Sequence, residues 1–392
     1  MRNEIFILGS ARTAIGTFGG SLLGISPIEL ATSVSKSAIK RSEIKASDIG
    51  HVAFGHVINT EPKDMYLSRL AALNAGISNA TPAMNVNRLC GSGLQAIVSI
   101  YQTLMMGDAD FGLAGGSENM SRSPHIISDA RWGRKMGDTA ITDMMIGALT
   151  CPFGTGHMGI TAENVANEYQ ISRHEQDYFA SESQKKAQRA VKTGIFKEQI
   201  IPIEVKKRKQ IVLFDTDEHP KETTLETLSN LPTVFKKDGT VTAGNSSGIN
   251  DGAAALVLGT QSAVIKNKLE PIAKILGYAH TGVRPEIMGI GPISAVQKLC
   301  KKLKLQINDF DVIESNEAFA AQACAVTKEL KLDSEKVNPN GGAIALGHPV
   351  GATGAILTIK ALSELKRTNT KLGLVTMCIG GGQGIAIGLE MV

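Results

Sequence analysis

A cysteine at position 90 stands where it can act as a nucleophile. It lies in segment 85–96, NVNRLCGSGLQA, in which an apolar stretch meets glycines and then a helical pattern. This order predicts that Cys90 lies at or near a helix N-terminus, where the helix dipole and free backbone N–H groups favour the thiolate. The glycines leave room for a substrate. On this segment alone, a buried structural cysteine is an equally open interpretation.

A histidine, His348, stands in segment 338–354, which is rich in glycine and carries almost no charge. Pro349 follows it and small residues flank it on both sides, a pattern that predicts an imidazole ring held against open space. An imidazole with a pKa near neutrality can take the proton of a thiol. The alternative is a core histidine whose hydrogen bonds are satisfied.

Two further segments carry candidate groups. In 377–384, MCIGGGQG, we expect Cys378 just after a strand, followed by glycines whose N–H groups can point into a cavity. A thiol there can exchange protons with a substrate carbon. In 314–321, ESNEAFAA, a strand end runs into a helix with Asn316 at the turn. A plain helix N-cap would also explain this asparagine.

The scaffold that must position these groups is predicted to be α/β. Short apolar runs alternate with helical patterns, and the runs are Ile5–Leu8, Val52–Phe54, Phe111–Ala114, Ala254–Leu258, Val312–Ile313 and Leu372–Thr376. The segment 47–49 before one strand resembles 308–310 before another, and each precedes a reactive glycine-rich segment by about forty residues. We therefore expect an internal duplication, with Cys90 and His348 in different halves.

At 392 residues the chain exceeds the roughly 250–300 residues at which single cores stop growing. We expect an N-terminal half at 1–118, completed by about 249–270, and a C-terminal half at 271–392. Between them the composition and the pattern of the sequence change, with Trp132, many methionines and a long helical stretch from Thr161 to Thr193. We interpret residues 119–248 as an inserted loop domain.

Composition excludes several other classes of protein. The net charge of +4, from 41 basic and 37 acidic residues, is too small to argue for nucleic acid. The basic run 206–209 indicates a solvated loop or hairpin edge, with a rim that attracts phosphates as the alternative. Apolar runs are too short for a signal peptide or a membrane span. Five cysteines without a C-x-x-C pair argue against disulfides and zinc, and favour the cytoplasm.

Taken together, these four segments resemble the thiolase family in order and spacing, over essentially the whole chain, and 131–164 looks most like bacterial biosynthetic β-ketothiolases. The resemblance implies a five-layered αβαβα fold of two similar halves with an inserted loop domain, assembled as a homotetramer, a dimer of dimers. It implies reversible condensation of two acetyl-CoA to acetoacetyl-CoA, or thiolysis of a short 3-ketoacyl-CoA. Coenzyme A is then substrate and product, and neither prosthetic group nor metal is needed.

The resemblance also implies roles for the candidate groups. Cys90 would be acylated, His348 would activate it, and Cys378 would move the proton on C2 of the second acyl-CoA. Such chemistry passes through an enolate, so the site must stabilise negative oxygen and exclude water. One oxyanion pocket would be His348 with a water held by Asn316. The other would be the backbone N–H groups of Cys90 and Gly380.

Positions that match the family's coenzyme A contacts are mostly apolar, as a pantetheine tunnel requires. They are His157, Met158, Lys221, Phe235, Ala243, Ser247, Met288, Ala318 and Phe319. Lys221 stands where related enzymes tend to carry arginine beside the adenine, and it would stack less well because it lacks a planar guanidinium. Segment 231–235, LPTVF, also lacks the Arg-Pro pair expected before the phenylalanine.

Four rival interpretations remain. A degradative 3-ketoacyl-CoA thiolase would use the same groups. A decarboxylating ketoacyl synthase would pair its cysteine with His-His or His-Asn and would lack Cys378. A papain-like hydrolase has the order Cys, His, Asn, whereas the order here is Cys90, Asn316, His348. From a different class, a silent acyl-CoA or lipid carrier would keep the fold without the reactivity.

Overall fold

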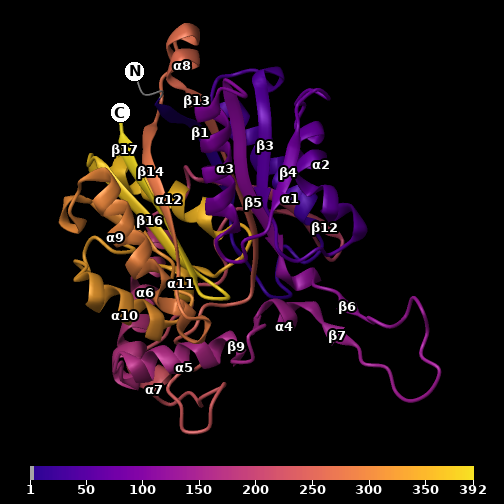
Figure 1. The fold of residues 1–392 in the computed structure, drawn as a ribbon, viewed down its shortest axis with the longest axis vertical. Coiled ribbons are helices and arrows are strands. Elements are labelled where there is room, and N and C mark those ends of the chain that lie inside the picture. Colours follow the sequence, from indigo (N-terminus) through magenta and orange to yellow (C-terminus); the bar gives the residue numbers. More distant parts are fainter. Residues whose placement is uncertain (1–3) are drawn as a thin grey trace.

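The computed structural model describes residues 4–392, which form an 11-stranded sheet covered by helices (Figure 1). The long strands of this sheet are β1 (Ile5–Thr13), β3 (Ile49–Gly55), β4 (Ala83–Val86), β5 (Phe111–Asn119), β13 (Asn250–Thr260), β14 (Ala273–Gly282), β15 (Val312–Ser315), β16 (Leu372–Ile379) and β17 (Gln383–Met391). Their order is β15-β16-β17-β14-β1-β13-β5-β3-β4, and the short strands β2 (Gly16–Thr17) and β10 (Ile200–Ile201) pair beside it.

The sheet consists of two halves with the same strand order and directions. In the first, β1 is antiparallel to β13, β13 is antiparallel to β5, and β5 is parallel to β3. In the second, β14 is antiparallel to β17, β17 is antiparallel to β16, and β16 is parallel to β15. A short antiparallel pairing of β1 with β14 joins them. The pairing confirms the duplication predicted from the sequence.

Helices form three layers with the two half-sheets between them. In the middle, α3 (Ser92–Met106) packs against α12 (Thr353–Thr368). On the outside, α1 (Pro27–Arg41) and α2 (Leu67–Asn74) cover the first half, and α9 (Gly291–Leu303) covers the second. Every residue of α12 from Thr353 to Leu362 is buried, as a helix between two sheets requires. This arrangement is the five-layered αβαβα fold.

Residues 119–248 and the adjoining loops carry shorter elements. They are β6 (His125–Ile126), β7 (Thr142–Asp143), α4 (Met144–Ala148), β8 (Thr150–Cys151), β9 (Gly156–His157), α5 (Met158–Glu168), α6 (Arg173–Lys192), β11 (Ile203–Lys207), β12 (Gln210–Phe214) and α7 (Leu225–Ser229). Later in the chain come α8 (Gln261–Asn267), α10 (Ala320–Leu330) and α11 (Ala343–Leu346). Both α5 and α6 pack against α10, which places this region beside the second half.

Two local segments bear on the sequence-based expectations. The helical stretch predicted over 161–193 is formed by two helices, α5 and α6, because Gln170 adopts a left-handed conformation (φ 52°) and Ser172 caps a new helix through a capping box with Glu175. The hairpin interpretation of the basic run is confirmed, since β11 pairs with β12 and Arg208 lies at the turn. Within residues 4–392, none of the helices is long and apolar enough to cross a bilayer.

Candidate active site

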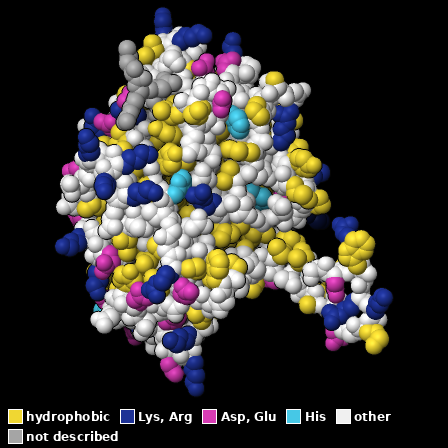
Figure 2. Space-filling view, in the orientation of Figure 1, with side chains coloured by type: hydrophobic (Ala, Val, Ile, Leu, Met, Phe, Trp, Pro, Cys, Tyr) yellow, Lys and Arg dark blue, Asp and Glu magenta, His cyan; other side chains and the backbone are white. Residues whose placement is uncertain are grey.

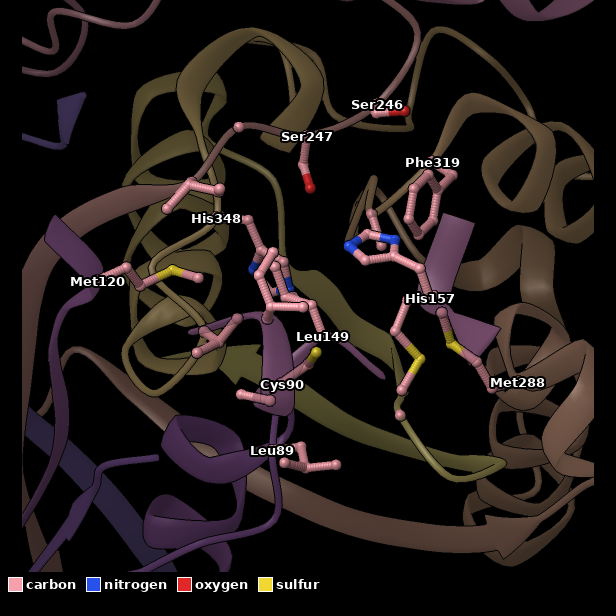
Figure 3. A pocket seen from close by; sticks show the side chains of 18 of the residues that line it. Leu89, Cys90, Met120, Leu149, His157, Ser246, Ser247, Met288, Phe319 and His348 are labelled. Carbon is pink, nitrogen blue, oxygen red and sulfur yellow. The ribbon is translucent and has the colours of Figure 1, made fainter. Parts of the chain in front are cut away.

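The two central helices bring Cys90 and His348 to one cavity. Cys90 precedes Gly91, the N-cap of α3, and His348 lies in the loop that leads into α12. Because α3 and α12 pack together, the loops before them meet. Both side chains line a cavity of about 370 Å³, and Figure 3 shows them reaching into the same space. Each half of the duplicated fold thus contributes one reactive group.

The turn before α3 is tightly held. Leu89 has a positive φ of 45°, which is rare for a residue with a branched side chain and marks strain next to the thiol. Ser92 stabilises the turn, since its hydroxyl accepts the Arg88 N–H at 2.8 Å and donates to the Leu89 carbonyl at 2.6 Å. A Cβ on Gly91 would lie 2.5 Å from the side chain of Ile379. A larger residue here would therefore have to displace the end of the Ile379 side chain, although the backbone of Gly91 itself is in the ordinary right-handed region (φ −79°).

The electrostatics of Cys90 differ from the sequence-based expectation. Burial raises the pKa of the Cys90 thiol to about 11, although the backbone N–H groups of Gly380 and Cys90 act in the opposite direction. The buried carboxyl of Glu118 raises it further. A helix N-terminus alone was expected to favour the thiolate, and that expectation is wrong for the unliganded site because desolvation outweighs the dipole. The thiol is protonated at rest and needs a base.

His348 is arranged to act as that base. The Thr353 hydroxyl donates to the Pro349 carbonyl at 2.9 Å, so its oxygen accepts a hydrogen bond from His348 Nδ1–H at 2.7 Å. This network assigns the proton to Nδ1 and leaves Nε2 with its lone pair. Burial lowers the pKa of His348 to about 4, which keeps the ring neutral near pH 7. A neutral imidazole with an unprotonated Nε2 can accept the thiol proton.

Asn316 contacts this imidazole from the end of β15. It is fully buried, and its Nδ2 lies 3.4 Å from His348 Nε2. The N-cap interpretation is wrong, since Phe319 is the N-cap of α10. Among residues 4–392, Asn316 Oδ1 has no hydrogen-bond partner. An unpaired buried amide oxygen costs about 1–3 kcal/mol. Asn316 lies behind His348 and is not among the residues that line the cavity.

Cys378 lies inside β16 rather than after it, which corrects the predicted strand end. It is fully buried and belongs to a hydrophobic cluster with Met158, Met288 and Phe319, all of which line the cavity. Burial raises the pKa of its thiol, and the proximity of Cys90 raises it further. The two sulfurs are therefore close neighbours, with Cys378 just outside the lining. Gly380, two residues later, lines the cavity itself.

Most of the residues predicted to contact coenzyme A form the cavity wall. These are His157, Met158, Phe235, Ala243, Ser247, Met288, Ala318 and Phe319. His157 stacks on Phe235 with ring centroids 4.7 Å apart, and Phe319 meets Phe235 edge-on at 6.2 Å. Lys221 lies elsewhere, on the exposed surface, where its main-chain N–H donates to Gln184 Oε1 at 3.0 Å.

Several residues of the site were missed by the sequence analysis. Thr353 fixes the tautomer of His348, and its only sequence signal is a position five residues after the histidine in the same glycine-rich segment. The other apolar residues of the wall are Val57, Leu89, Met120, Ile146, Ala148, Leu149, Val234, Ile249 and Val350. An apolar side chain in a wall carries the same sequence pattern as one in a core, so no signal distinguishes these residues.

Acid should destabilise the fold through two histidines, of which His348 is buried and His219 is partly buried. Burial lowers the pKa of His348 and of His219 to about 4. Above an unfolded pKa near 6.5 both rings are neutral in both states. Below pH 6.5 these histidines become protonated in the unfolded chain but stay neutral in the folded chain. The free energy of unfolding therefore falls as the pH is lowered to about 4, by roughly 3 kcal/mol per histidine. Urea unfolding at pH 7 and 4.5 should therefore show that the free energy of unfolding falls less between these two pH values in His348→Gln than in the wild type. The exposed His174→Gln is the control, and equal losses in all three proteins would contradict the assignment.

Comparison with known proteins gives consistent matches. The family model described as the N-terminal domain of thiolase matches residues 5–262, and that of the C-terminal domain matches residues 269–391. Beta-ketothiolase BktB of Cupriavidus necator is 54% identical, and an acetyl-CoA acetyltransferase of Syntrophomonas wolfei is 45% identical, each over 100% of both chains. The crystal structure of the Bacillus anthracis acetyl-CoA acetyltransferase superposes with a TM-score of 0.97 at 42% identity, covering 100% of this chain and 99% of that one.

Proposed function

The chain belongs to the thiolase family and is an acyltransferase, and we propose that it interconverts two acetyl-CoA with acetoacetyl-CoA and coenzyme A through an acyl group on Cys90. Thiolysis of short 3-ketoacyl-CoA runs through the same intermediate in reverse. One observation carries the proposal most directly: a thiol and an imidazole from opposite halves of the fold line one apolar cavity. The orientation of the imidazole, with Nε2 unprotonated, supports its role as the base.

In the first half-reaction, His348 Nε2 takes the proton of Cys90, and the thiolate attacks the carbonyl carbon of acetyl-CoA. The carbon–sulfur bond to coenzyme A breaks, and the leaving thiolate takes a proton from Cys378. Acylated Cys90, a positively charged His348 and a Cys378 thiolate remain. Opposite charges on His348 and Cys378 attract each other in a site of low dielectric constant.

In the second half-reaction, the Cys378 thiolate removes a proton from C2 of a second acetyl-CoA. The resulting enolate attacks the acyl carbon on Cys90, the Cys90 thiolate leaves, and His348 returns the proton to it. All three groups are then in their starting states. The raised pKa of the Cys378 thiol makes its thiolate a strong base, which abstraction of a proton from carbon requires.

Negative oxygen develops at two places. We propose that charged His348 and a water held by Asn316 stabilise the oxygen of the enolate formed from the second acetyl-CoA. Asn316 Oδ1 has no hydrogen-bond partner among residues 4–392. We propose that the backbone N–H groups of Cys90 and Gly380 stabilise the thioester oxygen on Cys90. Both groups lower the pKa of the Cys90 thiol, which indicates that they point toward the reacting sulfur. Losing one such donor typically costs about 10²–10³ in rate.

The aromatic and methionine wall suits the pantetheine arm of coenzyme A, which is largely uncharged. We propose that Lys221 meets the nucleotide end from its exposed loop. Its contact would be electrostatic rather than a stacking one, because an ammonium group is not planar. The five free thiols support a reducing location, the cytoplasm.

An assay across acyl lengths tests this function. Purified protein with fixed coenzyme A is expected to cleave 3-ketoacyl-CoA of four to six carbons, followed by loss of the 3-ketoacyl absorbance, and to cleave long-chain substrates poorly. A cavity of about 370 Å³ that also holds pantetheine leaves space for only a short chain. Absence of thiolysis at every chain length would contradict the proposal, whereas preference for long chains would favour the degradative interpretation.

We also propose that the protein is a homotetramer, held together by the arm formed by residues 125–143. The arm is a two-strand ladder of β6 and β7 that projects from the body, with hydrophobic side chains on its surface (Figures 1 and 2). Trp132 is 91% exposed and Met136 is 86% exposed. Large apolar side chains on a projecting segment mark an association surface.

Removing these side chains should separate the tetramer into dimers. The Trp132→Ser/Met136→Ser double variant is expected to sediment as a dimer, because it loses the apolar area that four arms would bury between them. Met106→Ser, which changes an equally exposed methionine at the end of α3, is the matched control. A double variant that still sediments at the wild-type mass would rule out the arm as the tetramer contact.

A further inference from the structure

Three consecutive side chains, at positions 217–219, anchor an exposed loop to the N-terminal half. Asp217 forms a buried bidentate ion pair with Arg12 at 2.8 and 2.9 Å and accepts the Ile15 N–H. Glu218 accepts the N–H and hydroxyl of Thr17. His219 follows, and its Nδ1 lies 3.2 Å from Asn250 Nδ2. The first two contacts fix the segment, and the third reaches toward the active site.

Asn250, the first residue of β13, joins this segment to the catalytic loop. It is fully buried, and its Oδ1 accepts the main-chain N–H of His348 at 3.0 Å. Its Nδ2 donates to the Gly16 carbonyl at 2.9 Å. The His348 N–H can only donate and the Gly16 carbonyl can only accept, so the amide orientation is fixed. The remaining N–H of Nδ2 therefore points to His219 Nδ1, which must carry a lone pair.

Two glycines leave the space that this amide occupies. Gly347 has a φ of 103°, and a Cβ there would lie 2.4 Å from Asn250. A Cβ on Gly248 would lie 2.3 Å from the His219 ring and 2.8 Å from Asn250 Oδ1. The main chain thus closes on the Asn250 and His219 side chains from both sides. A side chain at either glycine would therefore displace Asn250 or His219.

We propose that Asn250 and His219 are positioning residues for the catalytic imidazole: Asn250 holds the main chain of His348, and neutral His219 holds Asn250. The proposal deepens the function proposed above and rests on it for the role of His348. Thr353 fixes the ring of His348 through Nδ1, and Asn250 fixes its main chain. Together they set where Nε2 lies relative to Cys90.

Burial favours the neutral form of His219, and the two nearest charges act on it in opposite directions. Lys221, two residues later, opposes a second positive charge, whereas Glu218 favours one. Asp251, beside Asn250 in β13, accepts hydrogen bonds from the N–H and hydroxyl of Ser121. His348 is the other titratable group that Asn250 contacts, through its main chain. In the wild type the donor to His219 is an N–H of the Asn250 amide, which does not titrate. The hydrogen bond therefore persists as long as His219 is neutral.

Loss of either residue should slow the transfer of the Cys90 proton without changing substrate affinity. A displacement of about 1 Å can cost 10²-fold in rate, so Asn250→Ala is expected to lower kcat by about 10²-fold with KM within about two-fold. His219→Gln keeps an acceptor for Asn250 and should retain kcat within about three-fold. His219→Ala leaves the Asn250 donor unpaired and should lose about ten-fold.

Asn250→Asp provides the sharpest test, because it makes the contact depend on pH. In this variant one oxygen of the ionised carboxylate still accepts the His348 N–H. The other oxygen replaces the amide nitrogen and cannot donate, so it repels the Gly16 carbonyl oxygen and the lone pair of His219 Nδ1. One proton shared between the new carboxyl group and His219 restores a donor. The kcat of Asn250→Asp relative to the wild type should therefore rise as pH falls from 8 to 6, whereas the ratio for Asn250→Ala should stay flat. Asn119→Asp, which also replaces a buried amide that donates to two carbonyls, should give a flat ratio too.

A second readout separates this proposal from the proposed function. The rate at which iodoacetamide alkylates Cys90, followed by peptide mass, reports proton transfer to His348 without any thiolase substrate. Asn250→Ala should slow alkylation by about ten-fold or more, and Asn250→Asp should recover as pH falls, whether or not the wild type cleaves acetoacetyl-CoA. Alkylation in Asn250→Ala at the wild-type rate, or a flat ratio for Asn250→Asp in both readouts, overturns the assignment.

Discussion

Replacing Cys90 by alanine is expected to lower both thiolysis and condensation by at least about 10⁴-fold, because no other group can carry the acyl chain between the two halves of the reaction. Cys90 lines the cavity, and Cys378 is buried behind it. Steady-state rates in both directions, with the unfolding midpoint of each protein, measure the effect. Folding should be little changed, since the thiol is at a partly exposed position.

A matched variant controls for general loss of a thiol. Cys300 is also a free cysteine at a partly exposed position, on α9 on the outside of the second half. Cys300→Ala should keep activity within about two-fold of the wild type, as surface substitutions usually do. If Cys90→Ala kept more than about one hundredth of wild-type turnover, a covalent role for Cys90 would be wrong.

Cys378→Ala should separate the two half-reactions. Acylation of Cys90 needs only a proton for the leaving thiolate, which water or the substrate can supply, so it should remain within about ten-fold of the wild type. Condensation needs a base at C2 of the second acetyl-CoA, and its rate should fall by about 10³-fold or more. Rapid-quench acylation by acetyl-CoA, in which the leaving group is the thiolate of coenzyme A, and steady-state condensation of acetyl-CoA measure the two steps separately.

The burial of Cys378 makes a packing control necessary. Cys151 belongs to the same hydrophobic cluster and is also buried, so Cys151→Ala removes a comparable volume without removing the proposed base. It should affect both half-reactions to a similar, small extent. Equal losses of acylation and condensation in Cys378→Ala, matching those of Cys151→Ala, would mean that Cys378 acts only in packing.

Local patterns were sufficient to predict where Cys90 lies relative to a helix and that the chain is duplicated. Glycines between an apolar run and a helical pattern predicted that Cys90 precedes a helix, and α3 begins two residues later. The repeated order of strand and reactive segment predicted the duplication that the strand pairing confirms. Both patterns are short in sequence, so both can be recognised without knowing what packs against them.

The charge state of Cys90 could not be predicted in the same way. Its partly buried side chain packs against a core cluster that includes Ile379, from the opposite half of the fold, nearly three hundred positions later in the chain. A helix N-terminus is a local feature and was visible, but desolvation depends on contacts that only the tertiary structure defines. The same limit applies to Asn250, whose partners are Gly16, His219 and His348.

Three long strands of the sheet also escaped the sequence analysis: β4, which has no fully buried residue, β14 and β17. β14 alternates buried and partly buried residues along most of its length, and it contains Gly277, so it has no continuous apolar run. β17 begins immediately after the glycines that follow Cys378, and those glycines were interpreted as a cavity loop alone. Gly381 and Gly382, with φ of 84° and 85°, in fact make the turn that pairs β16 with β17. A search for uninterrupted apolar segments finds central parallel strands better than it finds these.

The most direct measurement is the site of acylation. Protein mixed with acetyl-CoA, quenched in acid and digested should carry an acetyl group on the peptide that contains Cys90, and addition of coenzyme A before the quench should remove it. An acetyl group on the Cys378 peptide instead, or turnover with neither peptide labelled, would contradict the assignment of Cys90 as the nucleophile.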